Sequence, residues 1–253
     1  MADLYICHHM GVGDAIHCNG MVRKLLADKN YDKVYVFVKN HNKNCIDWMY
    51  RDNDQIETIG FDITPQKMDG NAVCAKTNKI FSERMKKNDK YLRIGFGEYF
   101  NKTNEIGPMS CDMIFYDQID MPYRNRFDYC YWERDSIEEE RVYRGLVPAD
   151  TKYIFVHDDI ERHLTFPIEN KFYVVKNDPS EILFNLGTVL EKAEEIHVME
   201  SSIRCMMEFH KPQLVANNVK LYLHLIPGRN HRPCYNNRLD AWNGTSLSWE
   251  IVG

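Results

Sequence analysis

The sequence predicts an α/β protein made of two Rossmann-like domains that face each other across a cleft. Apolar runs of strand length alternate with helical patterns, which is typical of parallel sheets covered by helices. This alternation runs twice, and the helix-stopping residues Gly145 and Pro148 separate the two runs. A chain of 253 residues is long enough for two such domains. We therefore expect one domain at residues 1–147 and another at residues 148–253.

The first run contains four expected strands, each rich in β-branched or aromatic residues: 4–7, 33–38, 56–61 and 91–96. Helices are expected where apolar residues recur at helical spacing: 14–26, 41–51, the end of 69–87, and 111–119. Arg124 and Arg126 lie among aromatic residues, a combination that can bind nucleic acid, but the acidic net charge favours a connection packed on the first domain. Ser136, with Glu139 three residues on, is expected to cap a further helix.

The second run repeats the pattern with five expected strands: 151–156, 171–175, 195–199, 212–216 and 221–225. One helix should begin at the capping box from Asp178 to Glu181, where Pro179 occupies the first helical position. A shorter helix is expected at residues 203–209, and the C-terminal tail has no regular pattern.

The composition indicates a folded protein without general affinity for nucleic acid. Hydrophobic residues make up 44% and charged residues 27%, and the net charge is -5. No apolar run approaches the roughly 20 residues that cross a bilayer, and the first residues lack the pattern of a signal peptide. The 8 cysteines are scattered without a Cys-x-x-Cys pair. We therefore expect free thiols, no bound metal and a cytoplasmic location.

The most informative stretch lies near the N-terminus, where a strand, a glycine turn and a helix follow one another. Such a turn directs backbone N–H groups towards an anion. Gly11 and Gly13 match two glycines of a dinucleotide site, but Ile16 occupies the position of the third. The next strand ends at Lys39, so the acidic residue that would bind a ribose is missing. Asp14, at the helix start, would repel a pyrophosphate, and it is either a catalytic base or a helix cap.

A second polar turn follows the strand expected at residues 195–199. Ser201 and Ser202 lie at a helix start, where hydroxyls and backbone N–H groups suit phosphate oxygens. Glu200 can accept hydrogen bonds from the hydroxyls of a sugar. The alternative interpretation is a plain serine N-cap without a ligand.

Together these two turns resemble the heptosyltransferase-like (family 9-like) glycosyltransferases, which have the two-domain GT-B fold. The family's Gly-Asp turn after the first strand is matched by Gly13 and Asp14. Its second-domain strand, short polar turn and helix are matched by residues 197–203, followed at the family's spacing by Pro212. The chain departs from the family in lacking the glycine after this second turn. It also lacks the histidine that follows, and has Arg204 nearby.

The resemblance implies a metal-independent glycosyltransferase that moves a sugar from a nucleotide-sugar to a hydroxyl of a glycan or another acceptor. The first domain would bind the acceptor, with Asp14 as general base and His157 or His17 as lower-ranked alternatives. The second domain would bind most of the donor, and arginines would neutralise the leaving diphosphate. The expected donor-binding residues are Gly11, Gly13, Arg162, Glu200, Ser201, Ser202 and Arg204. No cofactor is expected, and a non-catalytic nucleotide- or sugar-binding module or a nucleotide-sugar epimerase are the alternatives.

Overall fold

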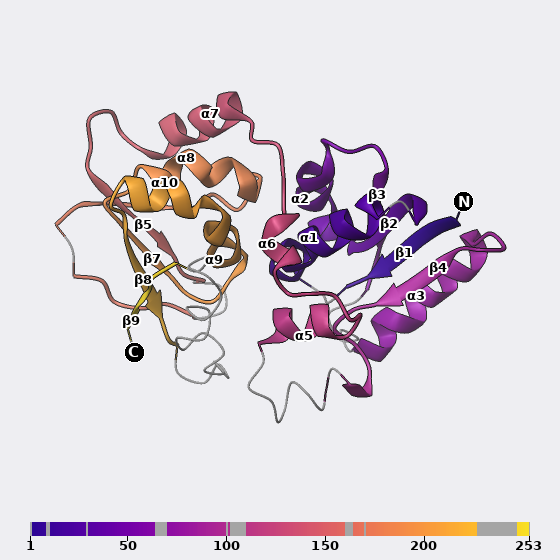
Figure 1. Ribbon diagram of the computed structural model, residues 1–253. Coiled ribbons are helices and arrows are strands. Elements are labelled where there is room, and N and C mark those ends of the chain that lie inside the picture. Colours follow the sequence, from indigo (N-terminus) through magenta and orange to yellow (C-terminus); the bar gives the residue numbers. More distant parts are fainter. Residues whose placement is uncertain are drawn as a thin grey trace. The chain divides into compact units, whose positions relative to one another are not determined.

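A computed structural model describes residues 2–8, 11–28, 30–63, 70–99, 101, 110–159, 164–169, 171–226 and 247–252 (Figure 1). The chain divides into two compact units, Met1–Glu133 and Arg134–Gly253. Each unit is an α/β structure whose described strands form one parallel sheet. The predicted fold class is therefore confirmed for each unit taken by itself.

The first unit has a four-stranded sheet with the strand order β3-β2-β1-β4. Its strands are β1 (Ala2–Cys7), β2 (Tyr31–Lys39), β3 (Ile56–Phe61) and β4 (Lys90–Arg93). Its helices are α1 (Val12–Ala27), α2 (Asn40–Tyr50), α3 (Gly70–Arg84), α5 (Cys111–Asp117) and α6 (Asn125–Asp128). Because β4 pairs with the other side of β1, the strand order reverses at β1, and such a switch point is where open α/β sheets bind ligands.

Both faces of this sheet are buried. Successive residues of a strand point to opposite faces, and Tyr5 and Cys7 of β1 pack with Val73 of α3. Leu4 and Ile6, on the opposite face of β1, are also fully buried. A parallel sheet covered on both faces leaves the carboxyl ends of its strands as the place where polar residues can meet a ligand.

The second unit has a five-stranded sheet with the order β6-β5-β7-β8-β9. Its strands are β5 (Tyr153–His157), β6 (Tyr173–Lys176), β7 (Glu195–Val198), β8 (Lys220–His224) and β9 (Glu250–Val252). Its helices are α7 (Ser136–Leu146), η2 (Leu183–Leu186), α8 (Gly187–Glu191), α9 (Ser202–Met207), η3 (Glu208–His210) and α10 (Lys211–Ala216), the two η segments being 3₁₀ helices.

Three local expectations for this second unit are wrong. Residues 212–216 belong to α10 rather than to a strand, and Pro212 lies in the first turn of that helix, where its missing N–H is not needed. The box at Asp178 does not open a helix, because its Oδ1 accepts from the N–H and hydroxyl of Ser180, at 2.8 and 2.7 Å, and closes a local turn. The tail, expected to be irregular, contributes β9, which extends the sheet beyond β8.

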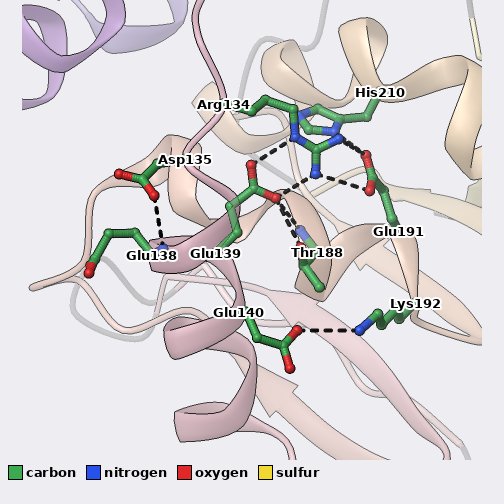
Figure 2. A network of polar contacts seen from close by, with 9 residues as sticks. All are labelled: Arg134, Asp135, Glu138, Glu139, Glu140, Thr188, Glu191, Lys192 and His210. Carbon is green, nitrogen blue, oxygen red and sulfur yellow. Dashed lines mark hydrogen bonds and ion pairs between the residues drawn. The ribbon is translucent and has the colours of Figure 1, made fainter.

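Helix α7 belongs to the second unit, whereas the boundary expected from the sequence follows it. Its cap is Asp135 rather than Ser136, with Oδ1 accepting from the N–H of Glu138 at 3.1 Å. Figure 2 shows how the helix is held: Arg134 Nε donates to Glu139 Oε1 (2.8 Å), and Arg134 Nη1 donates to Glu191 Oε1 of α8 (2.6 Å). Glu139, which is 0% exposed, also accepts from the N–H of Thr188 at 3.0 Å. These polar contacts tie Arg134 and α7 to α8, and they place the break between the units before α7.

Candidate active site

The turn between β1 and α1 brings Gly11, Gly13 and Asp14 together, as the sequence predicts. Gly11 is the N-cap of α1 in an extended conformation, and Asp14 is the third residue of the helix. The half-buried Asp14 carboxylate reaches back, and its Oδ2 accepts from the Gly11 N–H at 2.7 Å. Capping is therefore one function of Asp14. It leaves proton-accepting capacity, because a carboxylate has two oxygens with about four lone-pair positions.

Helix α1 is fixed deep in the first unit, so Asp14 is carried on a rigid element. A side-chain carbon at Gly20 would lie only 2.4 Å from the carbonyl oxygen of Asn125, so glycine allows α6 to approach α1 closely. The Tyr116 hydroxyl accepts from the N–H of Met21 at 3.0 Å and donates to the carbonyl of His17 at 2.9 Å. The resulting pre-organisation is what a catalytic group requires.

His17, an alternative base, lies in the interior of the first unit. It is buried, and its Nδ1 is 4.0 Å from Oδ2 of Asp112. Arg126 is 0% exposed, and its Nη1 contacts the same Asp112 oxygen at 2.8 Å. Although burial opposes the shift, the Arg126 guanidinium holds the pKa of Asp112 far below its ordinary value. The arginine and its aromatic neighbours therefore form a packed connection, as the charge balance predicts.

A small pocket opens beside the β1–α1 turn. Its apolar wall includes Phe37 of β2 and Val73 of α3. Its polar lining includes His8, which follows β1, and Lys39, the last residue of β2. Burial lowers the pKa of the Lys39 ammonium, and the nearby Asp14 carboxylate opposes that shift. The first unit thus carries a buried lysine at the wall of this pocket, under the influence of the Asp14 carboxylate.

In the second unit, the polar residues gather where β5, β6 and β7 end. His157, the other alternative base, ends β5, and its Nδ1 is 2.8 Å from Oδ1 of Asn177, which follows β6. The carbonyl of His157 accepts from the N–H of Met199, just before the Glu200 turn, at 3.3 Å. His157 and this turn are therefore neighbours in the second unit. Arg162, an expected donor-binding residue, lies outside the described residues.

The turn after β7 is a serine-capped helix start. Ser201 is the N-cap of α9, and its hydroxyl accepts from the N–H of Arg204 at 3.4 Å. Ser202 is the first residue of this helix, and both serines are half-buried. The capping geometry is present, as it is for Asp14, and it leaves the serine hydroxyls able to donate.

Arg204 is 1% exposed and is surrounded by carboxylates of its own unit. Its Nη2 is 2.9 Å from Oε1 of Glu208, and its Nε is 3.5 Å from Oε2 of Glu200. The guanidinium therefore has a close ion pair with Glu208 and a longer one with Glu200. To neutralise a diphosphate as the sequence predicts, it would have to exchange these carboxylates for phosphate oxygens.

Two features of the structure are not among those that the sequence predicts. One is the burial of Lys39, whose position at a strand end was the only signal. The other is a pair of buried histidines, in which Nδ1 of His197 lies 3.0 Å from Nε2 of His224 and the His224 ring stacks on Phe166 at 3.7 Å. Alternation along β7 and β8 places both histidines on one face of the sheet, a signal available from the sequence.

Two general properties concern the described residues only. No group of three or more His, Cys, Asp or Glu residues among them is arranged to hold a metal ion. Within the same ranges, no helix has both the length and the apolar character needed to cross a membrane.

Two solved structures resemble the chain over nearly its whole length. A glycosyl transferase of family 9 from Veillonella parvula DSM 2008 is 8% identical with a TM-score of 0.55, and the match covers 99% of this chain and 86% of that one. ADP-heptose lipopolysaccharide heptosyltransferase II from E. coli is 12% identical with a TM-score of 0.52, covering 100% and 90%. No protein-family profile and no curated protein sequence matches the chain. This likeness establishes that the chain has the GT-B fold of glycosyltransferases.

Proposed function

We propose that the protein is a glycosyltransferase that moves a sugar from a nucleotide-sugar to an acceptor hydroxyl, without a metal ion. The observation that carries the proposal is the half-buried carboxylate of Asp14, held at the start of α1 on the turn that borders a small pocket, in a chain of GT-B fold. Fold alone does not assign an activity, so the proposal depends on this site.

Asp14 would act as the general base. As the acceptor oxygen attacks the anomeric carbon, its proton passes to the Asp14 carboxylate, a C–O bond forms, and the bond to the nucleoside diphosphate breaks. The contact of Asp14 with the Gly11 N–H supports this role, because it fixes the direction of the carboxylate. His157 remains a lower-ranked alternative, and the burial of His17 argues against direct contact of that ring with an acceptor.

The donor would be bound mainly by the second unit. Ser201 and Ser202 would hydrogen-bond the diphosphate, and Glu200 would accept from a hydroxyl of the ribose or the sugar. Arg162 and Arg204 would supply positive charge to the leaving diphosphate in place of a metal, Arg204 after exchanging its carboxylates. Gly11 and Gly13 would let the donor approach the first turn closely.

The test is a binding and turnover experiment with UDP-, GDP-, ADP- and dTDP-sugars. A specific donor should stabilise the protein by about 2.7 kcal/mol at a hundredfold excess over its dissociation constant. With a panel of glycan acceptors, release of nucleoside diphosphate should then depend on the acceptor and persist in a chelator. Binding without release would identify a non-catalytic binding module, and dependence on Mg²⁺ or Mn²⁺ would contradict the metal-free mechanism.

A further inference from the structure

Tyr116 of α5 binds the backbone of α1 at one particular step of the helix. Its hydroxyl accepts from the N–H of Met21 at 3.0 Å and donates to the carbonyl of His17 at 2.9 Å. Met21 follows His17 by four residues, and these are the two groups that an α-helix normally joins to each other. The tyrosine hydroxyl therefore bridges one step of the hydrogen-bond ladder of α1.

This bridge lies just after the part of α1 that carries the proposed base. A side chain that enters the ladder of a helix is one of the known causes of a change in helix direction. Residues 12–17 precede the bridge, and Asp14 lies among them, about one turn before His17. The direction of this first part of α1 is therefore set by Tyr116 at one end and by the cap at Gly11 at the other.

Tyr116 is suited to a fixed contact of this kind. Its side chain is 0% exposed, and its ring meets that of Tyr123 edge-on, with 5.7 Å between the ring centroids. Burial raises the pKa of the Tyr116 hydroxyl, so the group keeps its proton and can donate and accept at the same time. Both hydrogen bonds lie away from water, where they are electrostatically stronger.

Helix α5 is itself tied to the sheet of the first unit. Gln118 is the C-cap of α5, and its Oε1 accepts from the N–H of Gly95 at 2.9 Å. Its Nε2 donates to the carbonyls of Phe96 and Arg93, at 3.0 and 3.2 Å. Arg93 is the last residue of β4, and β4 pairs with β1. Tyr116 thus relates the direction of α1 to a helix end that the sheet holds in place.

We propose that Tyr116 is a positioning residue for the proposed reaction, and that its bridge to His17 and Met21 sets the place of the Asp14 carboxylate. A contact that merely joins α5 to α1 would contribute to stability alone. The kinetic part of this inference rests on the proposed role of Asp14 as the base, whereas the place of the carboxylate can be measured without any ligand.

The amide proton of Gly11 reports that place, because the Asp14 carboxylate accepts it at 2.7 Å. Amide NMR spectra of the isotope-labelled full chain are compared for the wild type, Tyr116→Phe and Tyr153→Phe. Tyr153 is the matched control in the second unit, since it is buried and its hydroxyl donates to the carbonyl of Val189 in α8 at 2.6 Å. Both variants keep the packed ring and lose one oxygen atom, so both proteins should fold.

In Tyr116→Phe the Gly11 amide signal should shift, whereas Tyr153→Phe should leave it in place. An unmoved Gly11 signal in Tyr116→Phe would overturn the proposal, whatever reaction the protein catalyses. If Tyr116→Phe does not fold, Gln118→Leu provides the same test, because it releases α5 from the loop after β4. Its control is Gln55→Leu, at an exposed glutamine that precedes β3 at the opposite edge of the sheet.

Kinetics give the second measurement, with a nucleotide-sugar and a glycan acceptor that are turned over. Tyr116→Phe should lower kcat by about tenfold, because a displacement of roughly 1 Å at a catalytic group can cost about a hundredfold. The dissociation constant of the donor should stay unchanged, and Tyr153→Phe should leave both quantities unchanged. A contact that only stabilises the fold would not reduce kcat of the folded protein. An unchanged kcat in Tyr116→Phe, or a loss of donor affinity equal to the loss of kcat, would contradict the positioning role.

The two measurements separate this proposal from the general one. If the Gly11 signal shifts in Tyr116→Phe but no nucleotide-sugar is bound or turned over, the positioning of Asp14 stands and the glycosyltransferase proposal fails. If glycosyl transfer occurs and is lost in Asp14→Asn, while Tyr116→Phe has the kcat of the wild type, glycosyl transfer stands and the role of Tyr116 fails.

Discussion

The turns that follow β1 and β7 satisfy the first N–H groups of a helix in different ways. After β1, the cap residue is a glycine, and the carboxylate of Asp14 reaches back to the Gly11 N–H at 2.7 Å. After β7, the cap residue is Ser201, and its hydroxyl accepts from the N–H of Arg204 at the longer distance of 3.4 Å. One turn presents a charged acceptor, and the other presents neutral hydroxyls.

The surrounding charges differ as well. Asp14 lies close to Lys39 at a cavity wall, on a helix of 16 residues. Arg204 is enclosed by Glu200 and Glu208 on a helix of 6 residues. The lysine near the first turn therefore borders a pocket, while the charges of the second turn compensate one another. This difference favours proton transfer at the first turn and hydrogen bonding of a ligand at the second.

Replacing Asp14 by Asn should have the largest effect of any change at either turn. Asn keeps the size and much of the capping ability of Asp but cannot accept the proton. We expect kcat to fall by on the order of a hundredfold or more, as for a lost general base, while donor affinity stays close to that of the wild type. Steady-state kinetics and calorimetric titration with the donor measure the two quantities.

The matched control is Asp28→Asn at the other end of the same helix. Asp28 is the C-cap of α1 and forms an exposed ion pair with Lys24, so its neutralisation should leave kcat unchanged. If Asp14→Asn instead unfolds the protein, or weakens donor binding while sparing turnover, Asp14 is a cap or a donor contact, and the contrast between the turns is lost.

Replacing Glu208 by Gln tests whether the charges of the second turn are structural. The buried Arg204 would lose its close ion pair with Glu208, and breaking a buried ion pair typically costs roughly 3 kcal/mol of unfolding free energy. Urea denaturation followed by circular dichroism measures the loss. Glu140→Gln, at an exposed ion pair with Arg144, should leave the stability almost unchanged. An unchanged stability of Glu208→Gln would mean that Arg204 does not need this carboxylate and is available to a diphosphate.

Much of the fold was predictable because its strands are short apolar runs bounded by turn residues. The buried strands β1 and β5 follow that pattern closely. The segment 212–216 was misassigned because a short run such as Pro212-Gln-Leu-Val-Ala216 has too few residues to reveal a helical period. The start of α7 was missed by one residue, since Asp135 and Ser136 are both good caps.

The two turns could be predicted because spacing determines which residue lies at a helix start. The burial of individual side chains could not be predicted in this way, since it depends on residues that are distant in sequence. The interior position of His17 is created by α5 and α6, which lie about a hundred residues further along the chain. Tyr116 of α5, which contacts His17, is 99 residues away from it in sequence. The pairing of Arg204 did have a local signal, because Glu200 and Glu208 are each four residues away, the spacing at which side chains along a helical turn can meet.

The stability of the two units should respond differently to acid. Burial and the neighbouring His197 lower the pKa of His224 to about 4 from its ordinary 6.5. Between these values the unfolded chain binds more protons than the folded one, so stability in the second unit falls as pH decreases from 6.5 to 4, by roughly 2 kcal/mol. In the first unit, Asp112 stays charged over this range, because its pKa is depressed in the folded state.

Hydrogen exchange measured by mass spectrometry at pH 7, 6 and 5, corrected for the intrinsic rates, follows each unit separately. Peptides of β7 and β8 should lose protection before those of β1 and β2. His224→Gln, which does not titrate and can still hydrogen-bond His197, should reduce the difference. Equal loss of protection in both units would show that the His197–His224 pair does not control the acid response.

The smallest effect should come from the serines of the second turn, where the two variants separate capping from ligand binding. Ser201→Ala removes the cap of α9 and should lower the unfolding free energy by about 1 kcal/mol or less, because the 3.4 Å contact is long. Ser202→Ala removes a hydroxyl at the first helical position and should leave stability unchanged. If both hydroxyls bind the donor, each variant should weaken its affinity by about three- to tenfold, the value of one hydrogen bond. Loss of stability in Ser201→Ala, with donor affinity intact in both variants, would leave this turn a helix cap and move the donor site elsewhere in the second unit.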